Sequence, residues 1–399
     1  MRGTRMYPQA APLAATCALL ILLAGMHWPQ VLAAEEVKPT PAARPTAARG
    51  PDERIVIRTD CISAEVWPKG YVSGVKADTF IDLKTGAKDH SFGLDIVDFL
   101  MQPGEPTDRG QYEFNNLYHG KIPKRYIELP QICTQAKDIP SDFAIGPDFV
   151  AVRQWWTYTQ AAAGYKTGSQ WQQTLVFPAG RRYFLACDRI RSANDIKDVF
   201  LRIDMPGHLR HKAGDVFEEV YLSYEGRIPA EDFRRDFPPD EKHLYQRGKQ
   251  KLPDRMIRAR KYRGEKMPWL AGMTLDPRAV WEAWRHQRGY ICFIQEIGGL
   301  DVKVGDHFSA AYIVGYFDDV KQMEAEYDRY RGMNSLAATK DVWLMSDGVL
   351  VEDGEGYRIV PQGRAAAPEK WRLLVGGKGS ATVNAQKIDV DGEKEVAVK

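Results

Sequence analysis

The chain has 399 residues and a formal net charge of +2, with 55 basic residues against 53 acidic ones. A charge this close to zero supplies no general field for binding nucleic acid or an anionic membrane, and we expect neither partner. The length suits one large domain with a smaller module beside it.

The N-terminus reads as a signal peptide. An apolar run from Leu13 to Gly25 follows two arginines, and the small residues around Val31 to Ala34 are typical of a signal-peptidase site. The run is too short to favour a membrane span. We therefore expect a signal peptide over 1–34, a disordered Pro- and Ala-rich linker over 35–53, and an exported protein that is periplasmic or extracellular. The mature chain is expected to have no integral membrane segment.

The clearest pattern in the chain lies between residues 149 and 188 and predicts three consecutive antiparallel strands. In the first of them, Val152 and Trp156 alternate with Arg153 and Trp155, which is the period-two alternation of a half-buried strand. Because neighbouring residues of a strand point to opposite faces, Trp155 and Trp156 must face opposite ways.

Short apolar segments separated by turn signals continue on both sides of these strands. We expect further strands at 55–59, 64–67, 74–82, 95–101, 126–136, 199–204, 216–224, 290–297 and 308–316. Such spacing without long helices predicts an all-β, mainly antiparallel sandwich with a few short helices.

The part of the chain after residue 226 is expected to be more varied. Residues 227–268 are rich in charge and proline, which predicts an excursion over the surface. Asp276-Pro277 is typical of a helix start, so we expect a short helix that ends at Gly289, and another over 318–331. Residues 340–399 alternate short apolar segments with Gly-rich turns and predict a small β-rich C-terminal module.

The cysteines and the missing motifs limit the possible chemistry. Cys61, Cys133, Cys187 and Cys292 contain no C-x-x-C pair, so we expect no metal centre. Buried thiols and disulfides are both compatible with an exported chain. The sequence has no phosphate loop and no dinucleotide fingerprint, and we expect no cofactor.

Two stretches resemble the galactose-mutarotase-like family. The first is Asn115-Asn-Leu-Tyr-His-Gly-Lys-Ile-Pro-Lys-Arg125, in which Asn115 or Asn116, His119, Gly120 and Arg125 match a family pattern of Asn, Leu-His-Gly-Gly and Arg, with Lys121 in place of the second glycine. The second is Cys292-Phe-Ile-Gln-Glu296, where Glu296 would take the position of the family's carboxylate base. The family's second His would correspond to His208 or His211.

The resemblance covers residues 54–332 and implies a galactose-mutarotase-like β-supersandwich, which also occurs in polysaccharide lyases and some glycoside hydrolases. It implies that His119 and Glu296 approach each other at the sugar. A His with Glu296 as its partner base would suit an aldose epimerase or mutarotase.

The same stretch also fits a different reaction, β-elimination at a uronate. This reaction needs cations to neutralise the carboxylate and a side chain to move the C5 proton. Lys121, Arg125 and Arg153 would supply the charge, and Tyr118 or His119 would move the proton.

The aromatic strands add a predicted sugar-binding surface. A face that carries Arg153, Trp155, Gln170 and Gln172 can stack on the C–H patches of a pyranose ring and bind its hydroxyls. We expect this face and the residues of the family resemblance to share one concavity.

Our leading hypothesis is an exported polysaccharide lyase that acts on an acidic, uronate-containing poly- or oligosaccharide. An aldose epimerase and a non-catalytic glycan-binding protein are the alternatives. The candidate residues are Tyr118, His119, Glu296, His208 and His211 for catalysis, and Asn116, Lys121, Arg125, Arg153, Trp155, Gln170 and Gln172 for substrate binding.

Overall fold

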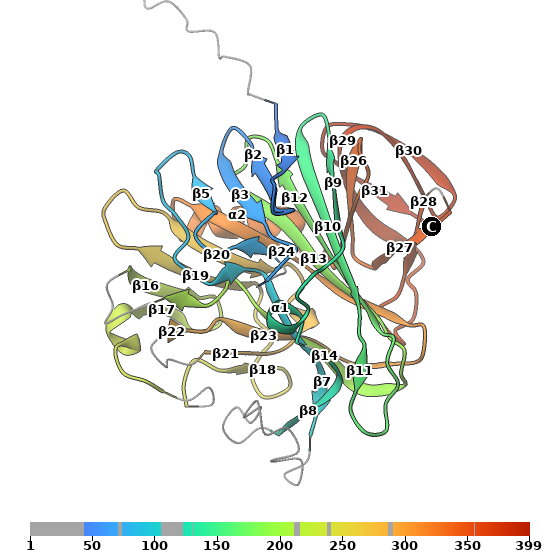
Figure 1. Cartoon of the computed structure of the whole chain (residues 1–399), viewed down its shortest axis with the longest axis horizontal. Coiled ribbons are helices and arrows are strands. Elements are labelled where there is room, and N and C mark those ends of the chain that lie inside the picture. The colour runs from blue at the N-terminus through green and yellow to red at the C-terminus, as the bar shows by residue number, and fades with distance from the viewer. Residues whose placement is uncertain are drawn as a thin grey trace, which may run out of the picture. The chain divides into compact units, whose positions relative to one another are not determined.

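The computed structural model describes residues 44–399 except 71–73, 105–122, 130, 211–215, 238–240, 286–289 and 355. Within these residues the chain forms mainly antiparallel β-sheets with a few short helices, which confirms the predicted fold class (Figure 1). None of the described helices is long and apolar enough to cross a membrane.

Two large sheets form the body of the fold. In spatial order, the nine-stranded sheet contains β17 (Gly226–Pro229), β16 (Phe217–Leu222), β19 (Met256–Tyr262), β20 (Trp269–Thr274), β24 (His307–Phe317), β13 (Tyr183–Arg191), β12 (Gln170–Pro178), β10 (Phe149–Thr157) and β9 (Ser141–Ile145). The seven-stranded sheet contains β11 (Gln160–Ala161), β8 (Lys124–Leu129), β7 (Ile96–Pro103), β14 (Ile196–Asp204), β23 (Ile294–Val302), β21 (Val280–Trp284) and β18 (Tyr245–Gln246).

The two sheets pack face to face over one apolar core. Val152 and Leu175 of the nine-stranded sheet and Leu201 and Ile297 of the seven-stranded sheet belong to the same buried cluster. Side chains of the opposite parity on either sheet therefore point away from this core, on the two outer faces of the sandwich.

A third, N-terminal sheet adds its apolar side chains to the same core. It consists of β1 (Thr46–Arg49), β2 (Ile55–Arg58), β3 (Ile62–Val66), β4 (Val75–Lys76), β5 (Ile81–Asp82) and β6 (Gly93–Leu94). The single strand expected over 74–82 is thus two short ones, because Asp78, between them, adopts a left-handed conformation with φ 63°.

The C-terminal residues form a further sheet, drawn in the orange to red part of Figure 1. It contains β25 (Ser335–Ala338), β26 (Val342–Ser346), β27 (Val349–Asp353), β28 (Gly356–Val360), β29 (Trp371–Val383), β30 (Gln386–Asp391) and β31 (Lys394–Val398). Leu336, Trp343, Met345 and Leu374 pack on the outer face of the nine-stranded sheet. The boundaries expected for the domains stay a prediction.

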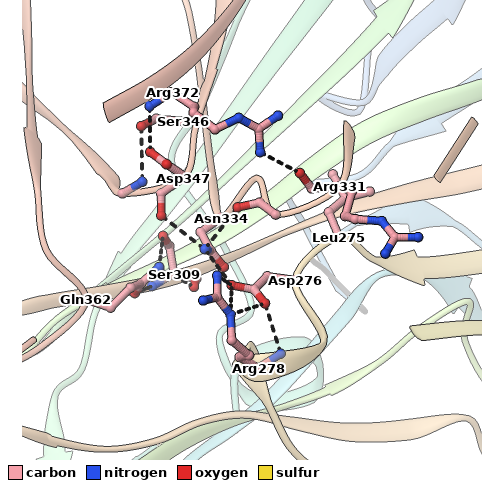
Figure 2. Close-up of polar contacts among 12 residues, drawn as sticks. Leu275, Asp276, Arg278, Ser309, Arg331, Asn334, Ser346, Asp347, Gln362 and Arg372 are labelled. Carbon is pink, nitrogen blue, oxygen red and sulfur yellow. Dashed lines mark hydrogen bonds and ion pairs between the residues drawn. The ribbon is translucent and has the colours of Figure 1, made fainter. Parts of the chain in front are cut away.

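A polar network also joins the C-terminal sheet to the body (Figure 2). The amide of Asn334 donates to Asp276 Oδ2 at 3.0 Å and to the carbonyl oxygen of Asp347 at 3.1 Å. Asn334 is 4% exposed, so water cannot replace these bonds easily.

One described helix lies close to its expected range, and another replaces the end of an expected strand. Helix α2 (Val320–Tyr330) begins after its N-cap Asp319, close to the range expected. The strand expected over 126–136 ends at Leu129, and α1 (Ile132–Gln135) follows. The described residues also contain two 3-10 turns, η3 (Ala230–Phe233) and η4 (Pro277–Ala279). A separate short ladder pairs β15 (Leu209–Arg210) with β22 (Tyr290–Ile291).

Two larger expectations are wrong. The helix predicted after Asp276 is a single 3-10 turn, although Asp276 does cap it, and the chain then enters β21. The predicted surface excursion over 227–268 contains β19, a strand inside the nine-stranded sheet whose Arg258 and Arg260 are fully buried. Buried partners explain this, because Arg258 donates to three backbone carbonyls and Arg260 pairs with Asp89.

Candidate functional site

The outer face of the seven-stranded sheet carries a group of ionisable side chains. In β14, Arg202 lies on this face because its neighbours Leu201 and Ile203 join the core. Strand pairing places Glu296 of β23 opposite Arg202, and Glu282 of β21 opposite Glu296. Two neighbouring strand pairs thus align three charged residues in one row.

Lys124 completes what we call the charge cluster, which consists of Lys124, Arg202, Glu282 and Glu296. Lys124 Nζ lies 2.7 Å from Glu296 Oε2 and 2.8 Å from Oε1, and it also donates to Glu282 Oε2. Arg202 Nη2 lies 2.7 Å from Glu296 Oε1. The four side chains are at most 3% exposed. Burying four charges is costly, so such a group is a candidate for function as well as for structure.

Aromatic rings surround the cations of the charge cluster. Lys124 Nζ lies 5.5 Å from the ring centre of Trp281 and 5.7 Å from that of Trp284. The guanidinium of Arg202 lies 5.4 Å from the Trp284 ring. These rings hold the two cations by cation–π attraction and surround the buried charges with aromatic side chains.

The two carboxyl groups of the cluster have opposite pKa shifts. Burial raises the pKa of Glu282 to about 7, with the charge of Glu296 adding to the rise and Lys124 opposing it. Burial also acts to raise the pKa of Glu296, but the charges and hydrogen bonds of Lys124 and Arg202 lower it overall. Near neutral pH the pair therefore contains one carboxyl that can hold a proton and one carboxylate that can accept one.

A second polar surface lies on the outer face of the nine-stranded sheet, and we call it the cationic groove. It is a cavity of about 330 Å³ whose lining includes Arg153, Trp155, Gln170, Gln172, Arg189, Arg191, His307 and Glu352. The guanidinium of Arg153 lies 5.3 Å from the ring centre of Trp155, and Trp155 is 38% exposed. Burial lowers the pKa of His307 to about 4, and the charges of Arg189 and Arg191 add to this fall. Arg153 is paired with Asp142 and Glu352, so Arg189 and Arg191 supply the net positive charge of the groove.

The predicted binding residues Arg153, Trp155, Gln170 and Gln172 do share one face, because Trp155 pairs with Gln172 and Thr157 with Gln170. Trp156 packs against the core, on the opposite face from Trp155, as the alternation of the strand predicts. Glu296, however, lies on the other outer face of the sandwich. The expectation that one concavity holds both sets is therefore wrong, because the core separates them.

Of the remaining predicted residues, His208 and Arg125 are described by the structure. His208 follows β14 in a short turn and contacts Asp204, which shares the parity of Arg202. Arg125 places its guanidinium 5.8 Å from the Tyr165 ring, whereas its neighbour Lys124 reaches Glu296. Asn116, Tyr118, His119, Lys121 and His211 lie outside the described residues, as do Asn115 and Gly120.

Sequence reasoning missed Lys124, Arg202 and Glu282. Glu282 could have been found from Val280-Trp-Glu-Ala-Trp284, whose aromatic and β-branched residues suit a strand, but the helix-start signal at Asp276 hid it. No local signal marks Arg202, because a charged residue in an apolar strand gains its role only from the partner strand.

No protein-family model matches this sequence, and no curated protein matches it significantly. Among solved structures, a galactose mutarotase-like protein from Clostridium acetobutylicum is 8% identical with a TM-score of 0.37, covering 69% of this chain and 98% of that one. A galactose 1-epimerase from Lactobacillus acidophilus is 9% identical with a TM-score of 0.39 and the same coverage.

A heparan sulfate lyase from Pedobacter heparinus is 10% identical with a TM-score of 0.32, and the match covers 90% of this chain and 43% of the lyase. The chain thus spans less than half the length of that enzyme. All three likenesses are at 10% identity or less and at TM-scores of 0.39 or less, so they assign neither a family nor a function to this chain.

Proposed function

We propose that the protein is a carbohydrate-active enzyme and that its chemistry takes place at the charge cluster on the outer face of the seven-stranded sheet. The observation that carries this proposal is the pair Glu282 and Glu296, which share Lys124 and have pKa values shifted in opposite directions. Neighbouring carboxyls with separated pKa values are the usual arrangement for acid–base catalysis.

The reaction we favour is β-elimination at a uronate of an acidic glycan. In this reaction a base removes the C5 proton, the electron pair forms the C4–C5 double bond, the C4–O bond breaks and the leaving oxygen takes up a proton. The ionised Glu296 would accept the C5 proton, and the protonated Glu282 would donate to the leaving oxygen. Lys124 and Arg202 would stabilise the negative charge that develops on the substrate carboxylate. Transfer of the proton from Glu296 to Glu282 would restore the starting state.

Two residues predicted from the sequence remain candidates for the proposed site. Tyr118 and His119 come shortly before Lys124 in the chain, and we keep them as candidates for the same site. Export is likewise our proposal, supported by the signal-peptide pattern of residues 1–34. Sequencing the N-terminus of the protein recovered from the periplasm or medium would test it, since cleavage after Ala33 or Ala34 is expected.

One set of assays separates the candidate functions. The mature protein is incubated with a panel of uronate polymers, and ultraviolet absorbance of the unsaturated product is followed. Appearance of the product supports elimination. Faster change of optical rotation in a fresh aldose solution, without the ultraviolet product, would instead show an epimerase that uses the same acid–base pair.

A second candidate function, non-catalytic glycan binding, is favoured by the cationic groove. Its exposed Trp155 and its surrounding arginines suit an acidic sugar chain, and the core separates it from the charge cluster. Retention of the protein on an affinity gel of a uronate polymer, with neither ultraviolet product nor change in optical rotation, would favour this function over catalysis.

A further inference from the structure

A carboxylate, an imidazole and a thiol meet beside the charge cluster. The ligand atoms of Asp204, His208 and Cys292 all lie within 4.8 Å of one another. Asp204 is the last residue of β14, His208 follows after a short turn, and Cys292 lies between β22 and β23. These three residue types are common ligands of zinc and related transition metals, with the thiolate giving selectivity over calcium and magnesium.

The backbone that carries these residues is held by one buried arginine. Arg258 donates to the carbonyl oxygens of Met205 at 2.6 Å and Phe293 at 3.1 Å, which are the residues next to Asp204 and Cys292. The amide of Phe293 also donates to Asp204 Oδ1 at 3.0 Å. The two segments are therefore fixed relative to each other, as a metal site requires of its supporting groups.

The turn before His208 has a backbone conformation that requires glycine. Gly207 has φ 106°, and a Cβ at this position would lie 1.8 Å from the carbonyl oxygen of Gly93. Only glycine fits such a position, so the turn brings His208 back toward Asp204 in a defined way.

Solvent can reach the group from one side. The side chain of His208 is 20% exposed, whereas Asp204 is fully buried and Cys292 is 1% exposed. The ring of His208 lies beside Phe92 and Tyr290, with ring centres 6.1 Å and 5.3 Å away. An ion could therefore enter past the imidazole.

We propose that Asp204, His208 and Cys292 bind a divalent transition metal of the zinc class. Cys292 would bind as the thiolate after releasing its proton, and one coordination position would stay open for water or a substrate oxygen. This inference goes beyond the proposed acid–base chemistry and does not depend on it. The ion would lie on the side of β14 that also carries Arg202.

The test uses the full mature chain, stripped with a chelator and titrated with Zn²⁺ and with Co²⁺. We expect one equivalent of Zn²⁺ by calorimetry, and a thiolate-to-cobalt charge-transfer band with the intense visible bands of tetrahedral Co²⁺. Cys292→Ser should abolish the charge-transfer band, and His208→Gln should weaken Zn²⁺ binding on the order of 10- to 100-fold.

A matched control is Cys187→Ala, which removes another buried thiol, on the outer face of the nine-stranded sheet, and should leave both signals unchanged. Zn²⁺ should also raise the melting temperature of the wild type and of Cys187→Ala but not that of Cys292→Ser. Absence of the charge-transfer band in the wild type, or equal Zn²⁺ affinity in the wild type and His208→Gln, would overturn the proposal and leave a metal-free hydrogen-bonded group.

Discussion

Lys124 and Glu296 lie 172 positions apart in the chain and form a buried ion pair, with Lys124 Nζ 2.7 Å from Glu296 Oε2. The same ammonium group contacts Glu282. One cation thus contacts two carboxyl groups whose pKa values are shifted in opposite directions, and the proposed chemistry depends on this difference.

A second carboxyl pair lies inside the sandwich and predicts a pH dependence of stability. Burial raises the pKa of Asp188 to about 7, and the pKa of Asp95 is raised by burial and by the charge of Asp188. Carboxyls whose folded-state pKa is raised stabilise the fold below their unfolded pKa, and this stability is lost as pH rises toward about 7.

We expect wild-type unfolding free energy to fall by about 3 kcal/mol between about pH 5 and pH 8 because of Asp188. Asp188→Asn should lose most of that fall, since its amide oxygen can still accept from Trp171 and Gln173. Urea denaturation at both pH values measures the difference. If the unfolding free energy of Asp188→Asn falls between the two pH values as much as that of the wild type, this pair does not titrate as described.

Trp155 is expected to contribute to glycan binding in the cationic groove. Trp155→Ala should weaken retention of an acidic polysaccharide on an affinity gel about 10-fold, because the stacking surface is lost. Leu252→Ala is the control, since Leu252 is 41% exposed outside the groove, against 38% for Trp155. Equal retention of both variants and the wild type would exclude the groove as the binding surface.

His307 should report directly on an anion in the groove. Its pKa is lowered by burial and by nearby arginines, so a bound carboxylate that offsets those charges should raise it. An NMR titration of His307 with and without a uronate oligosaccharide measures the shift, with the His307→Gln spectrum assigning the signal. A neutral oligosaccharide of the same length should give a smaller shift, and no upward shift with the acidic one would contradict an anionic ligand.

Asn334 is expected to fasten the C-terminal sheet (Figure 2). Asn334→Ala removes the amide that donates to Asp276 and to the carbonyl oxygen of Asp347, although Arg278 still donates to Asp276, and should lower the unfolding free energy by about 2 kcal/mol. Asn334→Asp should cost more, because it places a second carboxylate beside Asp276. Chemical denaturation ranks the two variants, and the reverse order would refute the role of the amide as donor.

The sequence predicts the parts of the fold that local patterns determine. Strands over 149–188 follow from strict alternation, and the exposure of Trp155 beside the packed Trp156 follows from the same rule. The cap at Asp276 is also found, but it opens one turn only, because β21 gains more from pairing with β23.

The candidate site is predicted less well, for a physical reason. The family resemblance predicts Glu296, whereas Lys124 and Glu282 reach it only through contacts between distant strands. The burial of Arg258 is also not predictable from the sequence, since its acceptors are backbone carbonyls that no sequence pattern indicates.

The most direct test of the proposed chemistry compares the wild type with Glu282→Gln and Asp188→Asn in the ultraviolet assay on uronate polymers. Glu282 and Asp188 are both buried carboxyls with a pKa raised to about 7, but only Glu282 contacts Lys124. We expect Glu282→Gln to lose activity on the order of 100-fold or more and Asp188→Asn to keep it. No unsaturated product from the wild type on any polymer, or equal rates for the wild type and Glu282→Gln, would contradict the assignment of Glu282 as the proton donor of an elimination.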